Sequence, residues 1–216
     1  MKTTATTLHR SRHSARDVRR VEYAANVAEA LGTLEHGCEI YGLSRGQYSL
    51  IDLVEYILAQ TGPADVVIST WTAAGADIGY ALRMRRNGNI RSLRWLVDAS
   101  FPVRQPGYCA AMRERFGDES IRVTKNHAKF VRIANDEWHI VCRTSMNLNE
   151  NKRIESFEIS DDPELCAYLG EFIDGLFTAI GGTEQFVAGN TAAERAFRST
   201  SDANIPPQRR VIRYLK

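Results

Sequence analysis

Short apolar segments with strand character alternate with helical segments along most of the chain, and this alternation constrains the fold more than any other feature. Breakers such as Thr61-Gly62-Pro63 and Asn87-Gly88 separate the segments. Strands and helices that alternate at this spacing favour an α/β domain, a layered sheet flanked by helices, over an all-α or all-β domain. The expected helices are 21–34, 49–61, 75–86, 109–116 and 163–180; the expected strands are 38–43, 66–69, 93–98, 121–133, 138–142 and 156–160.

Local signals mark the ends of several segments. Ser49 followed by Asp52 is an imperfect capping box, because the usual partner is Glu or Gln. Asp162 places a good N-cap residue before Pro163, at the first position of a helix. Asn135-Asp136-Glu137 supplies a turn, so the two strands around it are expected to form a β-hairpin.

The 216 residues fit one compact domain with appendages. Residues 1–20 are polar and basic and predict a flexible arm, whereas residues 186–216 turn polar and end with basic residues, which predicts a flexible extension. We therefore expect the folded domain to span residues 21–185.

The charges are nearly balanced, with 28 Lys and Arg residues against 26 Asp and Glu residues and a formal net charge of +2. This balance excludes a histone-like polycation and an acidic disordered tail, so a surface that binds a polyanion must be local. No apolar run approaches the roughly 18 residues that span a bilayer, and the first residues lack the apolar stretch of a signal peptide. We expect a soluble, cytoplasmic protein without membrane contact.

The four cysteines are scattered and form no C-x-x-C pair: Cys38, Cys109, Cys142 and Cys166. This spacing argues against a disulfide framework and a zinc ribbon and favours reduced cysteines that pack in the core. No His, Cys and Asp residues cluster with the spacing of metal ligands, so neither a metal nor another cofactor is expected.

The segment 121–133 carries the residues with the clearest chemistry. Side chains two apart lie on the same side of a strand, so His127 and Lys129 present an imidazole and an ammonium together. After the hairpin, Ser145 and Asn147 add a hydroxyl and an amide at the next turn.

This order, H-x-K, a hairpin and then S-x-N, resembles the phospholipase D superfamily. The family continues with an acidic residue before another strand, matched by Glu155, and with an acidic-Pro-Glu helix start, matched by Asp162-Pro163-Glu164. Residues 65–180 follow the order of one half of that fold. The sequence departs from the family pattern at Ala134, where an Asp is expected, at Thr144, where Gly is common, and at Arg153, where Asn is frequent.

The resemblance implies a metal-independent phosphodiesterase that acts through a phosphohistidine. His127 would attack phosphorus, while Lys129 and Asn147 donate to the phosphoryl oxygens. Ser145 would be an auxiliary donor, and Glu155 would orient the imidazole. Because the chain has one H-x-K motif, the half-unit is expected to pair as a homodimer in which two copies of His127 meet, one attacking and one donating a proton.

The resemblance favours a nuclease, with DNA favoured over RNA as the partner. Basic residues could contact phosphates without reading bases: Arg83, Arg85, Arg86 and Arg94 near a helix end and the next strand, and Arg12 in the arm. Two alternatives stay open, a catalytically inactive nucleic-acid-binding or assembly module and a phospholipid hydrolase. Trp71, Trp95 and Trp138 lie in or beside strands, which favours core packing over base stacking.

Overall fold

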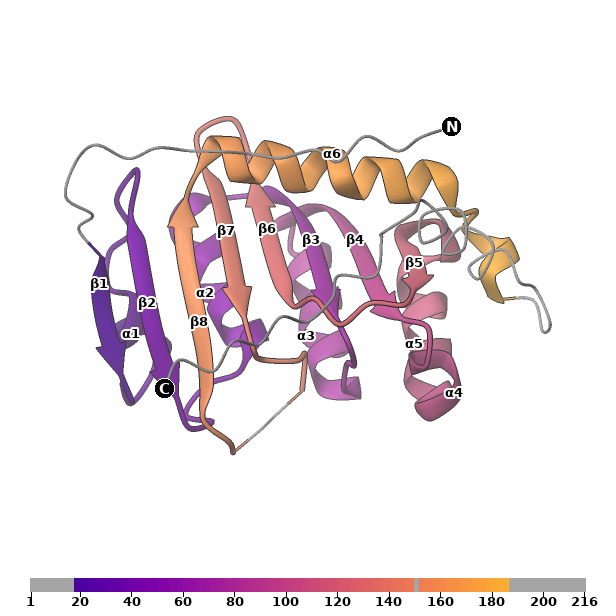
Figure 1. Cartoon of the computed structure of the whole chain (residues 1–216), viewed down its shortest axis with the longest axis horizontal. Coiled ribbons are helices and arrows are strands. Elements are labelled where there is room, and N and C mark those ends of the chain that lie inside the picture. The colour runs from indigo at the N-terminus through magenta and orange to yellow at the C-terminus, as the bar shows by residue number, and fades with distance from the viewer. Residues whose placement is uncertain (1–17, 150–151, 187–216) are drawn as a thin grey trace, which may run out of the picture.

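The computed structural model describes residues 18–149 and 152–186, which form a mixed eight-stranded sheet with helices on both faces (Figure 1). The strands are β1 (Arg19–Glu22), β2 (Glu39–Ser44), β3 (Ala64–Thr70), β4 (Ile90–Asp98), β5 (Ile121–Thr124), β6 (Phe130–Ala134), β7 (His139–Thr144) and β8 (Glu155–Asp161). The helices are α1 (Val27–Leu31), α2 (Leu50–Thr61), α3 (Gly75–Arg86), α4 (Phe101–Arg104), α5 (Pro106–Phe116) and α6 (Pro163–Ala179), with 3-10 turns η1 (Asp118–Ser120) and η2 (Thr183–Phe186). The α/β class expected from the alternation is confirmed.

The strand order is β1-β2-β8-β7-β6-β3-β4-β5. Strands β3, β4 and β5 are parallel and joined by helices. On the other side of β3 the sheet continues with β6, β7, β8 and β2, each antiparallel to the strand before it, and ends with β1, which is parallel to β2. As a result, one edge of the sheet, at the bottom in Figure 1, is made of strand termini. It contains the ends of β2, β3, β4, β5 and β7 and the beginnings of β6 and β8. We call it the site edge.

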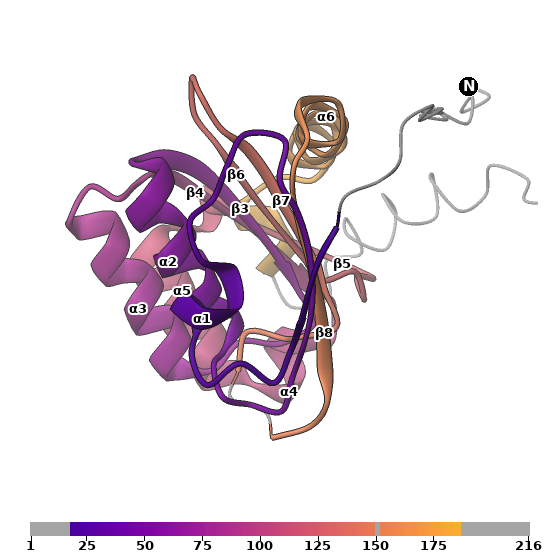
Figure 2. The same cartoon turned by 90° about the vertical axis from the view of Figure 1, so that its left-hand side faces the viewer.

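The hydrophobic core lies on both faces of the sheet. Helices α1, α2, α3 and α5 cover one face and α6 crosses the other (Figure 2). On the α6 side, Ile173 packs on Val67, Leu96 and Phe130. The capping signals are confirmed, since the Ser49–Asp52 box opens α2 and the Asp162 side chain accepts from the Leu165 amide at the start of α6.

The predicted helix 21–34 is wrong at its start. Val21 lies instead in β1, where it pairs in parallel with Gly42 of β2, and the helix is reduced to the five residues of α1. Arg19, assigned by the sequence to the basic arm, also belongs to β1, and its guanidinium donates to the Leu31 carbonyl oxygen at the end of α1 (2.6 Å). Pairing with a strand distant in sequence overrides the weak helical periodicity here.

The predicted strand 121–133 is two strands. β5 pairs with β4 at one end of the sheet, whereas β6 lies between β3 and β7. Residues 125–129 therefore cross the site edge past the ends of β4 and β3 (Figure 1). His127 and Lys129 lie in this crossing segment and not within a strand.

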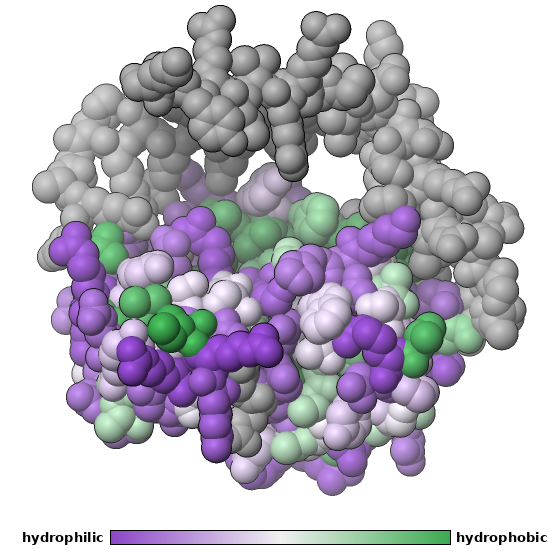
Figure 3. Space-filling model, turned by 60° about the horizontal axis from the view of Figure 1, so that its bottom comes forward, coloured by the Kyte–Doolittle hydropathy of each residue, from purple (hydrophilic) through white to green (hydrophobic). Residues whose placement is uncertain are grey.

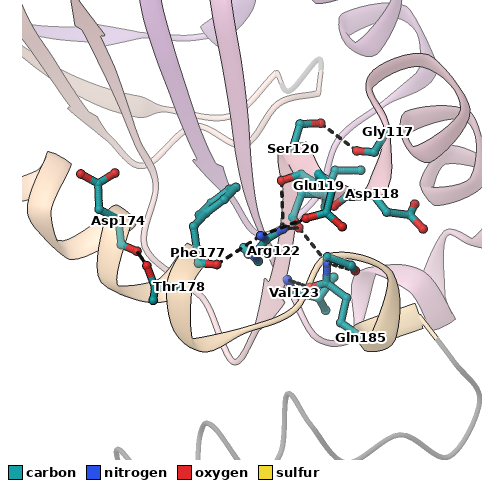
Figure 4. Close-up of polar contacts among 12 residues, drawn as sticks. Gly117, Asp118, Glu119, Ser120, Arg122, Val123, Asp174, Phe177, Thr178 and Gln185 are labelled. Carbon is teal, nitrogen blue, oxygen red and sulfur yellow. Dashed lines mark hydrogen bonds and ion pairs between the residues drawn. The ribbon is translucent and has the colours of Figure 1, made fainter.

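The edge strand β5 is fastened to α6 and η2 by side chains (Figure 4). The buried Arg122 guanidinium donates to the carbonyl oxygens of Ile121 (2.8 Å) and Phe177 (3.2 Å) and lies 4.2 Å from the Phe177 ring centroid. Gln185 accepts from the Val123 amide and donates to the Ile121 carbonyl oxygen, both at 2.7 Å. These side-chain bonds cover the backbone of an edge that would otherwise be free to pair with another chain.

We expect Arg122→Ala to lower the free energy of unfolding by about 2–4 kcal/mol, because it removes the guanidinium donor to the Phe177 carbonyl oxygen and the packing of a buried side chain on the Phe177 ring. Urea denaturation measures the change. Arg91→Ala, at an exposed position near the start of β4, is the control and should change stability by about 0.5 kcal/mol or less. Equal stabilities of the two variants would contradict this role of Arg122.

Candidate active site

The crossing segment is held by the buried side chain of Asn126. Its Nδ2 donates to Ser69 Oγ (3.0 Å) and to the Leu96 carbonyl oxygen (3.3 Å), so it bonds to both β3 and β4. Its Oδ1 accepts from the Ala128 amide (3.1 Å) on the far side of His127. One side chain thus replaces the strand pairing that this segment lacks and fixes the backbone around His127.

Asp98, at the end of β4, also holds the crossing segment in place. Its Oδ2 accepts from the Asn126 amide (3.1 Å), and its Oδ1 accepts from the amide and hydroxyl of Ser100. Burial acts to raise the pKa of Asp98, but the hydrogen bonds from Ser100 and Asn126 and the charge of Arg104 outweigh it, so the pKa is lowered. Asp98 is therefore an anion that belongs to the framework of the site.

His127 is exposed on this framework, and the lysine two residues later lies against it. Lys129 Nζ is 3.4 Å from each ring nitrogen of His127 and donates to the His127 carbonyl oxygen (3.0 Å). Burial lowers the pKa of the Lys129 ammonium from its ordinary 10.5, and the charge of Glu155 opposes this effect. An imidazole and a partly desolvated cation therefore face solvent together.

Glu155 and Ser145 join the site from β8 and the end of β7. Ser145 Oγ donates to Glu155 Oε2 and accepts from the Ser156 amide (2.9 Å). Because Glu155 also acts on the charge of Lys129, the structure links Ser145, Glu155, Lys129 and His127 at the site edge. The sequence predicts that Glu155 orients the imidazole; the structure gives it a hydrogen bond from Ser145 and an electrostatic effect on Lys129.

Asn147 lies in the loop that follows. The next residue, Leu148, donates to the Thr72 carbonyl oxygen (3.2 Å) and accepts from the Ala74 amide (2.8 Å), so the loop is tied to the chain leaving β3. Asn147 Oδ1 is buried and has no hydrogen-bond partner within residues 18–149 and 152–186. The loop therefore lies at the site edge, and the role of the Asn147 amide stays a prediction.

A small cavity beside Glu155 has unpaired polar groups in its wall. It measures ≈ 10 Å³, about the space that one water molecule needs. Among the described residues, the Ser44 and Tyr48 hydroxyls and Asn149 Oδ1 in this wall have no partner. Burial, with a smaller contribution from Glu29, raises the pKa of Tyr48 to about 12, so Tyr48 stays a hydrogen-bond donor.

Two residues at the site were missed by the sequence analysis. Trp71 was expected in the core, but it is half-buried at the end of β3, and its ring meets that of His127 edge-on with 6.1 Å between centroids. Arg104, at the end of α4, lies over the Trp71 ring at 3.6 Å from its centroid. The position of Trp71 directly after a buried parallel strand was the available signal. Trp95 is fully buried, as expected.

The predicted phosphate-binding arginines do not gather around His127. Arg83, Arg85 and Arg86 end α3, which starts at the site edge and runs back to the opposite edge. Arg94 pairs with Asp174 on α6 and lies 5.2 Å from the Phe177 ring centroid. Arg12 lies outside the described residues. Contact of these arginines with nucleic acid remains a prediction.

Other features of the site edge are plain. Figure 3 turns this edge toward the viewer and shows a mostly hydrophilic surface with small apolar patches.

The four cysteines are free, and Cys109, Cys142 and Cys166 are buried. In the part of the chain that the structure describes, no three His, Cys, Asp or Glu side chains are grouped as a metal site requires. None of its helices has the length and apolar character to cross a bilayer.

No protein-family model and no curated protein matches the sequence. Among solved structures, Nuc from Salmonella typhimurium, a phospholipase D family member, is similar over 65% of this chain and 93% of its own (17% identity, TM-score 0.45). NucT from Helicobacter pylori matches over 65% and 96% (13% identity, TM-score 0.44). Phosphatidylserine synthase from Haemophilus influenzae matches over 76% of this chain and 46% of its own (15% identity, TM-score 0.46). The chain is thus similar in fold to a phospholipase D family member.

Proposed function

We propose that this chain is a phosphodiesterase that cleaves nucleic acid and uses His127 as its nucleophile. The observation that carries the proposal is the exposed imidazole with the Lys129 ammonium 3.4 Å from its ring nitrogens, on a polar edge of the sheet. A phosphodiester carries one negative charge, and a cation beside the nucleophile would bring phosphorus within reach and offset that charge.

The reaction needs a nucleophile, cationic donors and a proton for the leaving oxygen. A neutral His127 nitrogen attacks phosphorus, a P–N bond forms, the P–O bond breaks, and the leaving oxygen takes a proton from the partner's His127. Water then attacks the phosphorus and gives a proton to the partner's His127, and the P–N bond breaks. Lys129 and Asn147 donate to the non-bridging oxygens in both steps. Ser145, the auxiliary donor of the motif, reaches these oxygens only when its hydroxyl turns from Glu155.

The second imidazole is the reason to propose a homodimer. Each chain supplies one His127 at the site edge, and the leaving oxygen needs a second group that gives up a proton near neutral pH. Isologous pairing across a two-fold axis would bring both copies to one diester. Glu155, bonded to Ser145 and acting on Lys129, would keep the donors in place and support the charged state of the site.

We expect cleavage to persist in EDTA, because protein groups supply the positive charge that other phosphodiesterases take from metal ions. The test measures hydrolysis of bis(p-nitrophenyl) phosphate and of matched DNA and RNA oligonucleotides, with DNA expected to be cleaved faster. His127→Ala should abolish all cleavage, whereas His139→Ala, at the start of β7 on the opposite edge, should not. Loss in EDTA that Mg²⁺ restores would contradict the proposal.

We expect Asn126→Asp to lower activity at least about tenfold, since a shift of the crossing segment misplaces the nucleophile. It should also lower the free energy of unfolding by about 1–3 kcal/mol, because a carboxylate brings no donors to Ser69 and Leu96. Activity and urea denaturation are measured together. Asn87→Asp, at the exposed end of α3, is the matched control, and equal behaviour of the two variants would contradict a positioning role.

The departures from the family pattern bear on the second candidate function, an inactive nucleic-acid-binding module. Ala134 is buried with Val141 and Cys166 beneath α6, at the end of β6 away from His127. Thr144 ends β7, and its hydroxyl donates to the Ser156 carbonyl oxygen on the neighbouring strand β8 (2.7 Å). Both departures are accommodated locally, and this favours the enzyme. A gel shift that survives His127→Ala while no preparation cleaves would favour the binding module.

A further inference from the structure

The Arg104 guanidinium is held in place although the residue is exposed. It lies over the Trp71 ring, with its Cζ 3.6 Å from the ring centroid. One Nη donates to the Trp71 carbonyl oxygen (3.1 Å) and Nε donates to Ser100 Oγ (2.9 Å). Stacking and two hydrogen bonds thus restrict a side chain that on a surface usually samples many rotamers.

The same framework carries the nucleophile. Ser100 donates to Asp98, and Asp98 accepts from the Asn126 amide directly before His127. Both functional groups contact the Trp71 ring: Arg104 Cζ lies 3.6 Å from its centroid, and the His127 ring meets it in an edge-type arrangement with 6.1 Å between centroids. A fixed guanidinium and the imidazole therefore share one indole ring as a neighbour.

The guanidinium has capacity left for a ligand. Its two hydrogen bonds to Trp71 and Ser100 use two of the five N–H groups, and the remaining donors keep the planar fork that fits a phosphate. Asp98 accepts from the Ser100 hydroxyl and from the Ser100 and Asn126 amides, and Arg104 acts on it through charge, with no hydrogen bond between the two in the part of the chain that the structure describes. Lys129 stands at the imidazole itself, so Arg104 is spaced to meet a different anionic group.

We infer that Arg104, held on Trp71, binds the phosphate next to the scissile phosphodiester in a nucleic acid strand. The inference rests on the proposed phosphodiesterase function. Successive phosphates follow one another along a polynucleotide, whereas a simple diester of a phospholipid has one phosphate. A second phosphate site therefore selects polymeric substrates. It specifies the proposed function further, as a phosphodiesterase that also binds the adjacent phosphate on one side of the scissile bond.

The experiment uses thymidine dinucleotide, which has one cleavable diester, and the same dinucleotide with an added phosphate at its 5′ or 3′ end. The wild-type protein should prefer one of the two phosphorylated forms by about tenfold in kcat/KM, the size of a charge-assisted hydrogen-bond pair. Arg104→Gln should lose this preference, chiefly through KM. Arg91→Gln removes the same charge at the far end of β4 and should keep it.

The outcomes separate the two ideas. A wild-type protein without preference for either phosphorylated form, or a preference that survives Arg104→Gln, would overturn the Arg104 site while the phosphodiesterase stands. The same substrates without bases give a further test. If the wild-type protein loses its preference for the phosphorylated abasic form to the same extent as Arg104→Gln loses it on the normal substrates, the result would point to base stacking on Arg104 and would also overturn the phosphate site. Absence of cleavage of the dinucleotides and of bis(p-nitrophenyl) phosphate would overturn the proposed function, and the inference with it.

Discussion

Wild-type protein mixed with His127→Ala protein should lose activity faster than the wild-type fraction falls. If each site uses two copies of His127, a dimer with one altered chain lacks either the nucleophile or the proton donor. After full subunit exchange at equal amounts, about one quarter of the dimers keep both imidazoles, so about one quarter of the activity should remain at constant total protein. A chain that works alone would keep about half.

The variant by itself sets the scale of this effect. Removing a nucleophile from a group of residues that act together costs several orders of magnitude, so we expect His127→Ala to retain less than about 10⁻³ of the wild-type kcat. Coexpression of differently tagged chains, followed by purification of the doubly tagged species, gives the mixed dimer directly. It should be as inactive as His127→Ala.

His139→Ala is the control for the mixing series, because it removes an imidazole at the opposite edge of the sheet. Its mixtures should follow the activities of the two proteins in proportion. A linear decline in the His127→Ala series, or a solution mass of one chain under assay conditions, would contradict a shared site.

The parts of the fold that the sequence predicted are those set by local signals. α2 and α6 begin at capping residues and carry apolar faces, and α3 spans the residues that its periodicity and the Asn87-Gly88 stop indicate. The β6–β7 hairpin also follows from its turn, where Asn135 Oδ1 accepts from the Trp138 amide (2.8 Å). Each of these features is decided within a few residues.

The parts that were missed depend on distant pairing. β1 exists because β2 offers it a parallel partner, and the run 121–133 divides because β5 and β6 pair with different strands. No glycine or proline marks the division; Asn126 makes it possible by bonding to the ends of β3 and β4. That bonding is invisible until the sheet order is known.

The difference between local signals and distant strand pairing also explains which parts of the site could be predicted from the sequence. The H-x-K and S-x-N spacing predicted that His127, Lys129, Ser145 and Asn147 lie near strand ends, because these residues are close in sequence to their own turns; their catalytic roles stay predictions. Trp71 follows β3 and Arg104 ends α4, the helix after β4, and only the parallel order of the strands brings Trp71 beside His127 and Arg104 over Trp71.

Lys129 should set the alkaline limit of activity. It has to be cationic to neutralise the phosphoryl oxygens, and burial lowers its pKa from 10.5. Activity should therefore be present at pH values below the lowered pKa and fall as the pH rises through it, before an ordinary lysine would lose its proton. Lys129→Met should lower kcat by about 10²–10³-fold at pH values below this pKa, as loss of one fixed donor to a transition state does, and its own pH profile should lack the alkaline limb.

Glu155 allows a test of the direction in which the alkaline limb of activity shifts. Its charge opposes the effect of burial and raises the pKa of Lys129, so Glu155→Gln should move the alkaline limb to lower pH as well as lower kcat. Glu158→Gln neutralises a neighbouring carboxylate on β8 that pairs with Arg143 and should leave the limb in place. The measurement is the pH profile of kcat for the three proteins. A limb that stays fixed or moves to higher pH in Glu155→Gln would show that another group sets it, because loss of a nearby negative charge can only make the partly buried Lys129 ammonium easier to deprotonate.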